Sequence, residues 1–257
     1  MNNNSGKVIT VSSVKGGVGK TTTVLNLAGI YFQMKKRVLI IDLDLSSGGV
    51  ATLLNIDNNR DIYTIVDAIS NNRFSSLDDY VINYNKGIDI IAAPRDPRDA
   101  NKIESKYIDR IIGLARASYD IILLDTNHVL NEISLTALDK STNNLFVLTN
   151  DLVDIKNMRN FLSILKENGM NNYYIVLNNS RDTGKDYIDI YNIRNMIDGN
   201  IDYTISRKFY IKNIDKYYLN GEILTLNKTI NKLYSKDIAD MKLMADALMT
   251  RKEVQDE

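Results

Sequence analysis

Several residue types are absent or scarce in this 257-residue chain, which contains no cysteine, two prolines and one histidine. The absence of cysteine excludes disulfides, thiolate metal sites and cysteine nucleophiles, and it favours a reducing, cytoplasmic compartment. No apolar run approaches 18 residues, so we expect no membrane-spanning segment. The first residues, MNNNSGKVIT, lack the basic and apolar regions of a signal peptide, which also favours the cytoplasm.

An excess of one charge sign is also lacking. Lys plus Arg and Asp plus Glu both number 32, so the formal net charge is zero. A protein that mainly coats nucleic acid usually carries a clear basic excess. DNA is therefore not the favoured partner, although a local basic patch is compatible with a neutral average.

Short apolar runs alternate with longer amphipathic stretches. Most runs, such as VLIID and IILLD, are apolar on both faces, which is typical of buried parallel strands. Strands are predicted at Lys7–Ser13, Arg37–Asp42, Ile88–Ala93, Tyr119–Asp125, Asn144–Thr149, Tyr173–Asn178 and Asp202–Ile205. Helices are predicted at Thr21–Met34, Tyr63–Ser70, Ile103–Ala117, Ser134–Lys140, Val153–Asn168, Asp186–Ile197, Lys208–Tyr217 and Ile230–Met249.

This alternation forces right-handed crossovers between parallel strands. The expected fold class is α/β, with a doubly wound, mostly parallel sheet of seven to eight strands and helices on both faces. No internal repeat or linker divides the sequence. We expect a single domain over residues 7–250, between a flexible tail at 1–6 and a polar tail at 251–257.

The segment VKGGVGKTT (14–22) follows a predicted buried strand and opens a predicted helix, the context that a phosphate-binding loop requires. Its glycines let backbone N–H groups turn toward phosphates, and the helix N-terminus adds free donors. Lys20 is expected to reach the β- and γ-phosphates, and the Thr21 hydroxyl to ligate Mg²⁺. The predicted nucleotide contacts are Gly16, Gly17, Val18, Gly19, Lys20, Thr21 and Thr22.

The loop departs from the general pattern because Val14 replaces its first glycine and Lys15 adds a second lysine. KGGVGKTT resembles the deviant Walker A loop of the ParA/MinD family, which are P-loop NTPases of the SIMIBI type. The resemblance implies ATP and ADP as ligands, slow dimer-dependent ATP hydrolysis and an ATP-dependent homodimer. It also implies that Lys15 reaches the partner's nucleotide, as an arginine finger does. The alternative is a solvent-exposed loop lysine.

Aspartates end two predicted strands at the edge of the sheet where ligands bind. By the same resemblance, Asp44 in IIDLD orients the attacking water and Asp42 lies near the Mg²⁺ shell, whereas Asp125 ends a Walker B strand and holds a water on Mg²⁺. Each aspartate alternatively caps its strand. The metal set is thus Thr21, Asp42 and Asp125, and the catalytic set is Lys15, Lys20, Asp44 and Asp125.

Two further positions bear on the nucleotide. Asn178 stands at the end of a strand where family members place an asparagine beside adenine, which implies ATP rather than GTP. The switch after Asp125 reads Thr126-Asn127-His128, and Asn127 stands where family members place a proline. A lost proline weakens the rigidity of this switch. His128 is most simply a loop residue.

The segments DLDLSSGGVATLL (42–54) and IIAAPRDPRDA (90–100) resemble those of the CpaE/TadZ branch. The resemblance extends over residues 7–225. It implies an ATPase that positions Flp/Tad pilus or secretion machinery through a protein partner, in the cytoplasm or recruited to the membrane or cell pole. The receiver-like domain common in that branch is not in this sequence.

Two alternative functions stay open. Cations and aromatics interleave at 207–218, followed by Lys228, Lys232 and Lys236, which fits a DNA-partitioning ATPase or simply a helix with solvated lysines. The altered switch fits a scaffold that binds nucleotide without hydrolysing it. In the last helix, Ile238, Met241, Met244 and Leu248 share one face, which predicts core packing rather than lipid binding.

Overall fold

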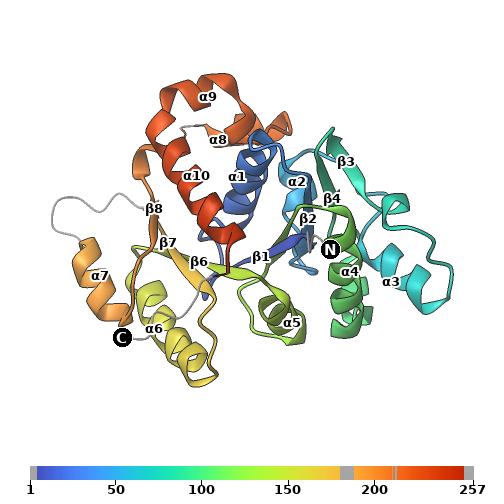
Figure 1. Ribbon diagram of the computed structural model, residues 1–257, viewed down its shortest axis with the longest axis horizontal. Helices are drawn as coiled ribbons and strands as arrows, with labels where there is room; N and C mark the ends of the chain where they lie inside the picture. The colour runs from blue at the N-terminus through green and yellow to red at the C-terminus, as the bar shows by residue number, and fades with distance from the viewer. Residues whose placement is uncertain (1–4, 180–187, 210, 212, 252–257) are drawn as a thin grey trace.

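The computed structural model describes residues 5–179, 188–209, 211 and 213–251. Within these residues, one eight-stranded sheet has the order β3-β4-β2-β5-β1-β6-β7-β8 (Figure 1). Every neighbouring pair is parallel except β3 and β4, which are antiparallel at one edge. The strands are β1 (Lys7–Ser12), β2 (Val38–Leu43), β3 (Ile82–Asn85), β4 (Ile88–Ile91), β5 (Ile121–Thr126), β6 (Asn143–Thr149), β7 (Tyr173–Asn178) and β8 (Tyr203–Ile205).

Helices cover both faces of this sheet, which confirms the predicted doubly wound α/β fold (Figure 1). α1, α9 and α10 pack on one face, and α3, α4, α6 and α7 on the other. The helices are α1 (Lys20–Gln33), α2 (Val50–Leu53), α3 (Ile62–Ser70), α4 (Ser105–Ser118), α5 (Glu132–Lys140), α6 (Leu152–Glu167), α7 (Ile190–Ile197), α8 (Ile214–Leu219), α9 (Lys228–Leu233) and α10 (Ser235–Met249). Short 3₁₀ turns are η1 (Leu77–Asp79), η2 (Pro97–Lys102), η3 (Arg207–Phe209) and η4 (Leu224–Leu226).

α1 is enclosed on two sides, by the sheet and by the C-terminal helices. The Tyr31 hydroxyl donates to the Ala245 carbonyl of α10 at 2.8 Å, and the Thr225 hydroxyl of η4 donates to the Asn26 carbonyl at 2.8 Å. The face of α10 predicted to pack in the core is buried, at Ile238, Met241, Met244 and Leu248. The helix that starts at the predicted phosphate loop is therefore fixed in place along its length.

The structure differs from the prediction at an edge strand and at two helices. β3 was not predicted, because INYN is a half-exposed edge strand without a long apolar run. The helix predicted at Lys208–Tyr217 is wrong as a continuous element. η3 ends at Phe209 and α8 begins at Ile214, after Asn213 takes a left-handed φ of 64°. The helix predicted at Ile230–Met249 is split at Tyr234, whose ring packs edge-on against Phe209 with centroids 5.6 Å apart.

The predicted ends of the chain lie mostly outside the described residues, at 1–4 and 252–257. Gly6 is tied to α4, since its N–H donates to the Arg116 carbonyl at 2.9 Å. Residues 186 and 187 of one predicted helix, and Tyr210 and Lys212 of the cationic stretch, also fall outside. Across the part of the chain that is described, no helix is long and apolar enough to cross a membrane.

Candidate functional site

The loop between β1 and α1 has the backbone of an anion-binding turn. Gly17 and Gly19 take φ of 72° and 95°, a left-handed conformation that residues with a Cβ rarely adopt. A Cβ on Gly19 would also lie 2.8 Å from Nδ2 of Asn178. The N-cap of α1 is Gly19, which has no side chain to cap the helix, so the first N–H groups remain available to an anion.

Lys20 lies inside this loop and is 9% exposed. Its Nζ donates to the Ser13 hydroxyl at 3.1 Å, and that hydroxyl donates to the Lys15 carbonyl at 2.7 Å. Burial lowers the pKa of Lys20, and the nearby carboxylates of Asp125 and Asp44 act in the opposite direction. A phosphate group would supply the counter-charge that this buried ammonium has only in part.

Thr21 and Asp125 meet beside Lys20. The Thr21 hydroxyl donates to Asp125 Oδ2 at 2.6 Å, and Asp125 Oδ1 is buried without a hydrogen-bond partner. Burial raises the pKa of Asp125 to about 7, opposed by the Thr21 hydrogen bond and by Lys20. An orphaned carboxylate oxygen beside a threonine hydroxyl is a donor set that fits Mg²⁺.

No cluster of three or more His, Cys, Asp or Glu side chains suited to a metal occurs among the described residues. This agrees with Mg²⁺, which is usually held by one or two protein groups together with nucleotide phosphates and water. Thr21 and Asp125 would supply the protein ligands here.

Asp42 and Asp44 stand at the end of β2 but have different surroundings. Asp42 is 1% exposed, and its two oxygens accept the N–H groups of Asp44 at 3.1 Å and Val50 at 3.0 Å. Burial raises the pKa of Asp42 well above its ordinary value, and the adjacent Asp125 adds to the effect. Asp42 therefore shapes the turn after β2, and its place in the Mg²⁺ shell stays a prediction. Asp44 is half-buried near Lys20 and Asp125.

Lys15, the second lysine of the loop, is paired within its own chain. Its Nζ lies 2.9 Å from Oδ1 of Asp151, the N-cap of α6, and the two side chains are 34% and 13% exposed. The role predicted for Lys15 is to reach the nucleotide of a second subunit. The side chain would have to leave Asp151 to perform that role.

A cavity of about 230 Å³ opens beside the loop and accommodates the predicted base contact. Asn178 lies in its wall, and its Nδ2 donates to the Val18 carbonyl at 2.8 Å. The wall joins the loop and α1 to the residues after β7 and β8: Gly17, Val18, Gly19, Thr22, Thr23, Asn26, Asn178, Asn179, Ile205, Ser206, Phe209, Ile214, Tyr218 and Leu224. Phe209 and Tyr218 give it aromatic sides suited to a planar base.

The sequence pattern of the AAA domain family (AAA_31) matches residues 6–172, which contain the loop, Asp42, Asp44, Asp125 and Asp151. The chain belongs to this family. The proteins that it is similar to include MinD proteins and a ParA family ATPase.

Two sequence relatives are similar to this chain over about half of its length. The chain is 32% identical over 119 residues to the septum site-determining protein MinD of Helicobacter pylori, covering 46% of this chain and 44% of that protein. It is 31% identical over 126 residues to the tyrosine-protein kinase YwqD of Bacillus subtilis, covering 48% and 51%. The match thus spans about half the length of these curated relatives.

Solved structures share the fold at lower identity. The ParA family ATPase of Chlorobium tepidum superposes with a TM-score of 0.77 and 21% identity, over 95% of this chain and 98% of that one. The cell division ATPase MinD of Pyrococcus furiosus gives 0.75 and 19%, over 95% and 98%.

The switch segment of this AAA domain is held by side chains instead of a proline. The Thr126 hydroxyl donates to the Val11 carbonyl at 3.1 Å, and Asn127 Oδ1 accepts the Val129 N–H at 2.9 Å. A Cβ on Gly16 would lie 3.5 Å from the His128 ring, so the lone histidine is next to the phosphate loop. The Asn127 side chain thus forms a local turn with its own backbone two residues on.

The two segments that resemble the CpaE/TadZ branch contact each other beside Asp42. A Cβ on Gly48 would lie 2.3 Å from the Ala93 Cβ and 3.1 Å from Asp42 Oδ2, so only glycine fits there. Asp61 joins the second segment to α3, because its carboxylate accepts the N–H groups of Thr64 and Arg95, both at 2.9 Å.

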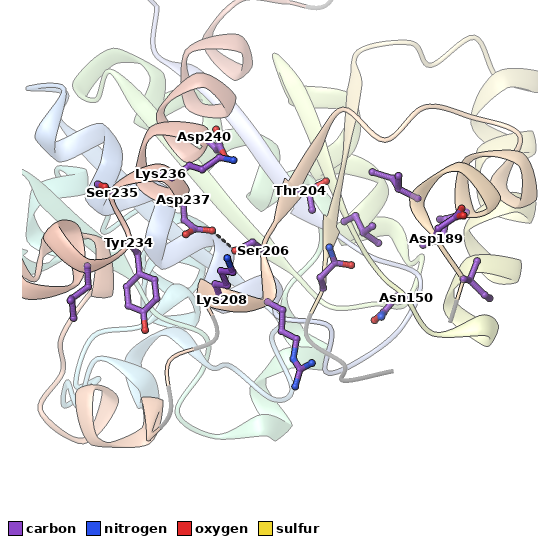
Figure 2. A pocket seen from close by; sticks show the side chains of 17 residues that line it. Asn150, Asp189, Thr204, Ser206, Lys208, Tyr234, Ser235, Lys236, Asp237 and Asp240 are labelled. Carbon is purple, nitrogen blue, oxygen red and sulfur yellow. Dashed lines mark hydrogen bonds between the residues drawn. The ribbon is translucent and has the colours of Figure 1, made fainter. Parts of the chain in front are cut away.

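A larger cavity of about 870 Å³ lies on the other side of β8, between α7 and the N-terminus of α10 (Figure 2). It shares Asn179 and Ser206 with the cavity beside the loop. Figure 2 shows Lys208, Lys236 and Asp237 at one end and Asp189 and Asn150 at the other. None of the residues predicted to bind nucleotide or metal lines it.

Sequence reasoning missed Ser13 and Asp151. Ser13 directly precedes the glycine-rich motif and gives no signal of its own. Asp151 had a signal, because it follows the buried strand LFVLT at the same edge of the sheet as Asp42 and Asp125. The strand-end rule applied to those aspartates would also have selected it.

Proposed function

We propose that this chain is a Mg²⁺-dependent ATP hydrolase in which bound nucleotide controls homodimerisation. The observation that carries the proposal is the meeting of Lys20, Thr21 and the orphaned oxygen of Asp125 at the open N-terminus of α1. Buried ionisable groups with perturbed pKa values cluster at functional sites, where a bound ligand supplies the missing charge or hydrogen bond.

The role of each residue follows from its position in the site. Loop N–H groups and Lys20 bind the phosphates, and Asn178 contacts the base in the aromatic-sided cavity. Thr21 and Asp125 would hold Mg²⁺, which neutralises charge on the β- and γ-phosphates. Asp44 accepts a hydrogen bond from the attacking water and so orients it. Lys15 of a second subunit adds positive charge at the γ-phosphate. Hydrolysis is therefore slow in the monomer, because the monomer lacks this charge.

Phosphate release by the purified chain tests this proposal. Lys20→Ala should abolish Mg²⁺-ATP hydrolysis, and Asn178→Ala should weaken the preference for ATP over GTP. Light scattering of Asp44→Ala should show a doubled mass with Mg²⁺-ATP but not with ADP. Dimers without phosphate release would point to the non-hydrolysing scaffold instead, and a monomer under every condition would contradict the dimer.

For the cellular role, we propose a switch that positions Flp/Tad pilus or secretion machinery through a protein partner. Support comes from the CpaE/TadZ-like segments, which pack together at Gly48 and Ala93 next to Asp42. Because this contact lies beside Asp42, we expect both segments to respond to bound nucleotide. A tagged copy should form polar or membrane-associated foci, and disruption should reduce piliation. Diffuse signal with normal piliation would exclude this role.

DNA partitioning is the second candidate. A plasmid partition protein of Borrelia burgdorferi shares the fold with a TM-score of 0.70, and Arg207, Lys208 and Lys236 line the larger cavity. Asp189, Asp237 and Asp240 line the same cavity and offset those cations. A gel shift of Asp44→Ala with ATP decides, since a cationic DNA site should retain DNA at about 50 mM salt.

A further inference from the structure

The ion pair between Lys15 and Asp151 joins the phosphate loop to the start of α6. Nζ and Oδ1 are 2.9 Å apart, and the carboxylate is 13% exposed. Both side chains belong to the same subunit. The pair holds the Lys15 ammonium on its own subunit.

Contacts other than the ion pair with Lys15 hold Asp151 in position. The same Oδ1 accepts the N–H groups of Val153 and Asp154 at 3.1 Å, as expected of an N-cap. Asp154, directly behind, is fully buried and uses Oδ2 to accept the N–H and hydroxyl of Thr149, each at 2.7 Å. Two carboxylates therefore face Lys15 from a fixed helix end, and only the lysine is free to move away.

We propose that Asp151 is a positioning residue that holds Lys15 in the resting subunit and sets how readily the lysine transfers to the nucleotide of a second copy. This inference rests on the dimer under Proposed function. The nucleotide phosphates must compete with Asp151 for the ammonium. Each subunit loses one ion pair on dimerising, so the restraint counts twice in the dimer equilibrium.

Asp151→Asn tests the proposal with little structural change, because asparagine caps helices as well as aspartate does. An ion pair of this exposure is worth a factor of about 1.4 to 5 in its own equilibrium. Two pairs per dimer give a dimer dissociation constant lower by about 2- to 25-fold. We would measure it by light scattering over a dilution series with Mg²⁺ and a non-hydrolysable ATP analogue.

Asp198→Asn is the matched control. It makes the same change in net charge and removes the surface pair of Asp198 with Lys166 at 3.3 Å. Asp198 has a φ of 52°, which asparagine tolerates, and it lies at the far end of α7. Its dimer dissociation constant should equal that of the wild type.

A double-mutant cycle of Lys15→Met and Asp151→Asn on urea unfolding of the nucleotide-free chain tests the pair without any dimer. Coupling of about 1.4- to 5-fold in the unfolding equilibrium, together with tighter dimers, supports the proposal. Dimers of unchanged or lower affinity in Asp151→Asn, while Asp198→Asn matches the wild type, overturn it and leave the proposed function intact. If neither the wild type nor Asp151→Asn dimerises, the proposed function fails as well.

Discussion

The stability of Asp125→Asn relative to the nucleotide-free wild type should increase as the pH rises. Burial raises the pKa of Asp125 from 3.8 to about 7. Below pH 3.8 the carboxyl is protonated in both the folded and unfolded chain. As the pH rises from 3.8 to about 7, the unfolded chain loses this proton first, so folding stability falls.

The pH dependence gives the size of the effect. Each pKa unit corresponds to about 1.36 kcal/mol, so wild type loses about 3 kcal/mol from this group between pH 5 and pH 8. Asparagine does not titrate, and its amide oxygen still accepts the Thr21 hydroxyl. Its buried NH₂ without an acceptor costs about 1–3 kcal/mol at every pH. The advantage of the variant should therefore grow by about 3 kcal/mol from pH 5 to pH 8.

Urea unfolding with EDTA and without nucleotide measures this difference at each pH. The variant should also lose Mg²⁺-dependent hydrolysis, because an amide is a weaker ligand than a carboxylate. A stability difference that stays constant within about 0.5 kcal/mol from pH 5 to pH 8 would refute the reasoning about Asp125.

Three other substitutions have effects that follow from the structure. Ser13→Ala leaves the Lys20 ammonium without its hydroxyl partner and should reduce the free energy of unfolding by about 1–3 kcal/mol, measured with urea, and raise the KM for ATP. Gly29→Ala puts a Cβ 2.1 Å from the Thr225 hydroxyl and should cost about 1–3 kcal/mol or more in the same assay. Gly113→Ala, in an exposed helix position with no atom within 4 Å, should instead stabilise by about 0.4–1 kcal/mol. Equal effects of the two glycine substitutions would contradict the packing described for α1.

Much of the fold could be predicted because its strands are buried on both faces. Runs such as VLIID are typical of a covered parallel sheet, and seven of the eight described strands were predicted. The failures come from tertiary contacts. Tyr234 packs on Phe209 where the last predicted helix divides, and Asn213 takes a left-handed φ just before α8. A periodic sequence pattern reports neither feature.

The site was predictable where a motif specifies backbone and charge together. The structure joins Thr21 to Asp125 by a hydrogen bond and places Lys20 near enough for the Asp125 charge to act on it. The pairing of Lys15 with Asp151 could not be predicted from the motif, because the partner is 136 residues away and depends on how β6 meets α6. The tight seat of Gly48 on Ala93 likewise depends on a contact between two separate loops.

The place of β1 in the sheet has a consequence for synthesis of the chain. β1 is made first, yet both of its neighbours come much later, with Lys7 beside Ile121 of β5 and Ile9 beside Asn143 of β6. At about 5–20 residues per second, a ribosome needs roughly 7–30 s to reach β6. During that time a strand of six residues, five of them destined for burial, has no partner. The phosphate loop therefore lacks its supporting sheet until more than half of the protein has been translated.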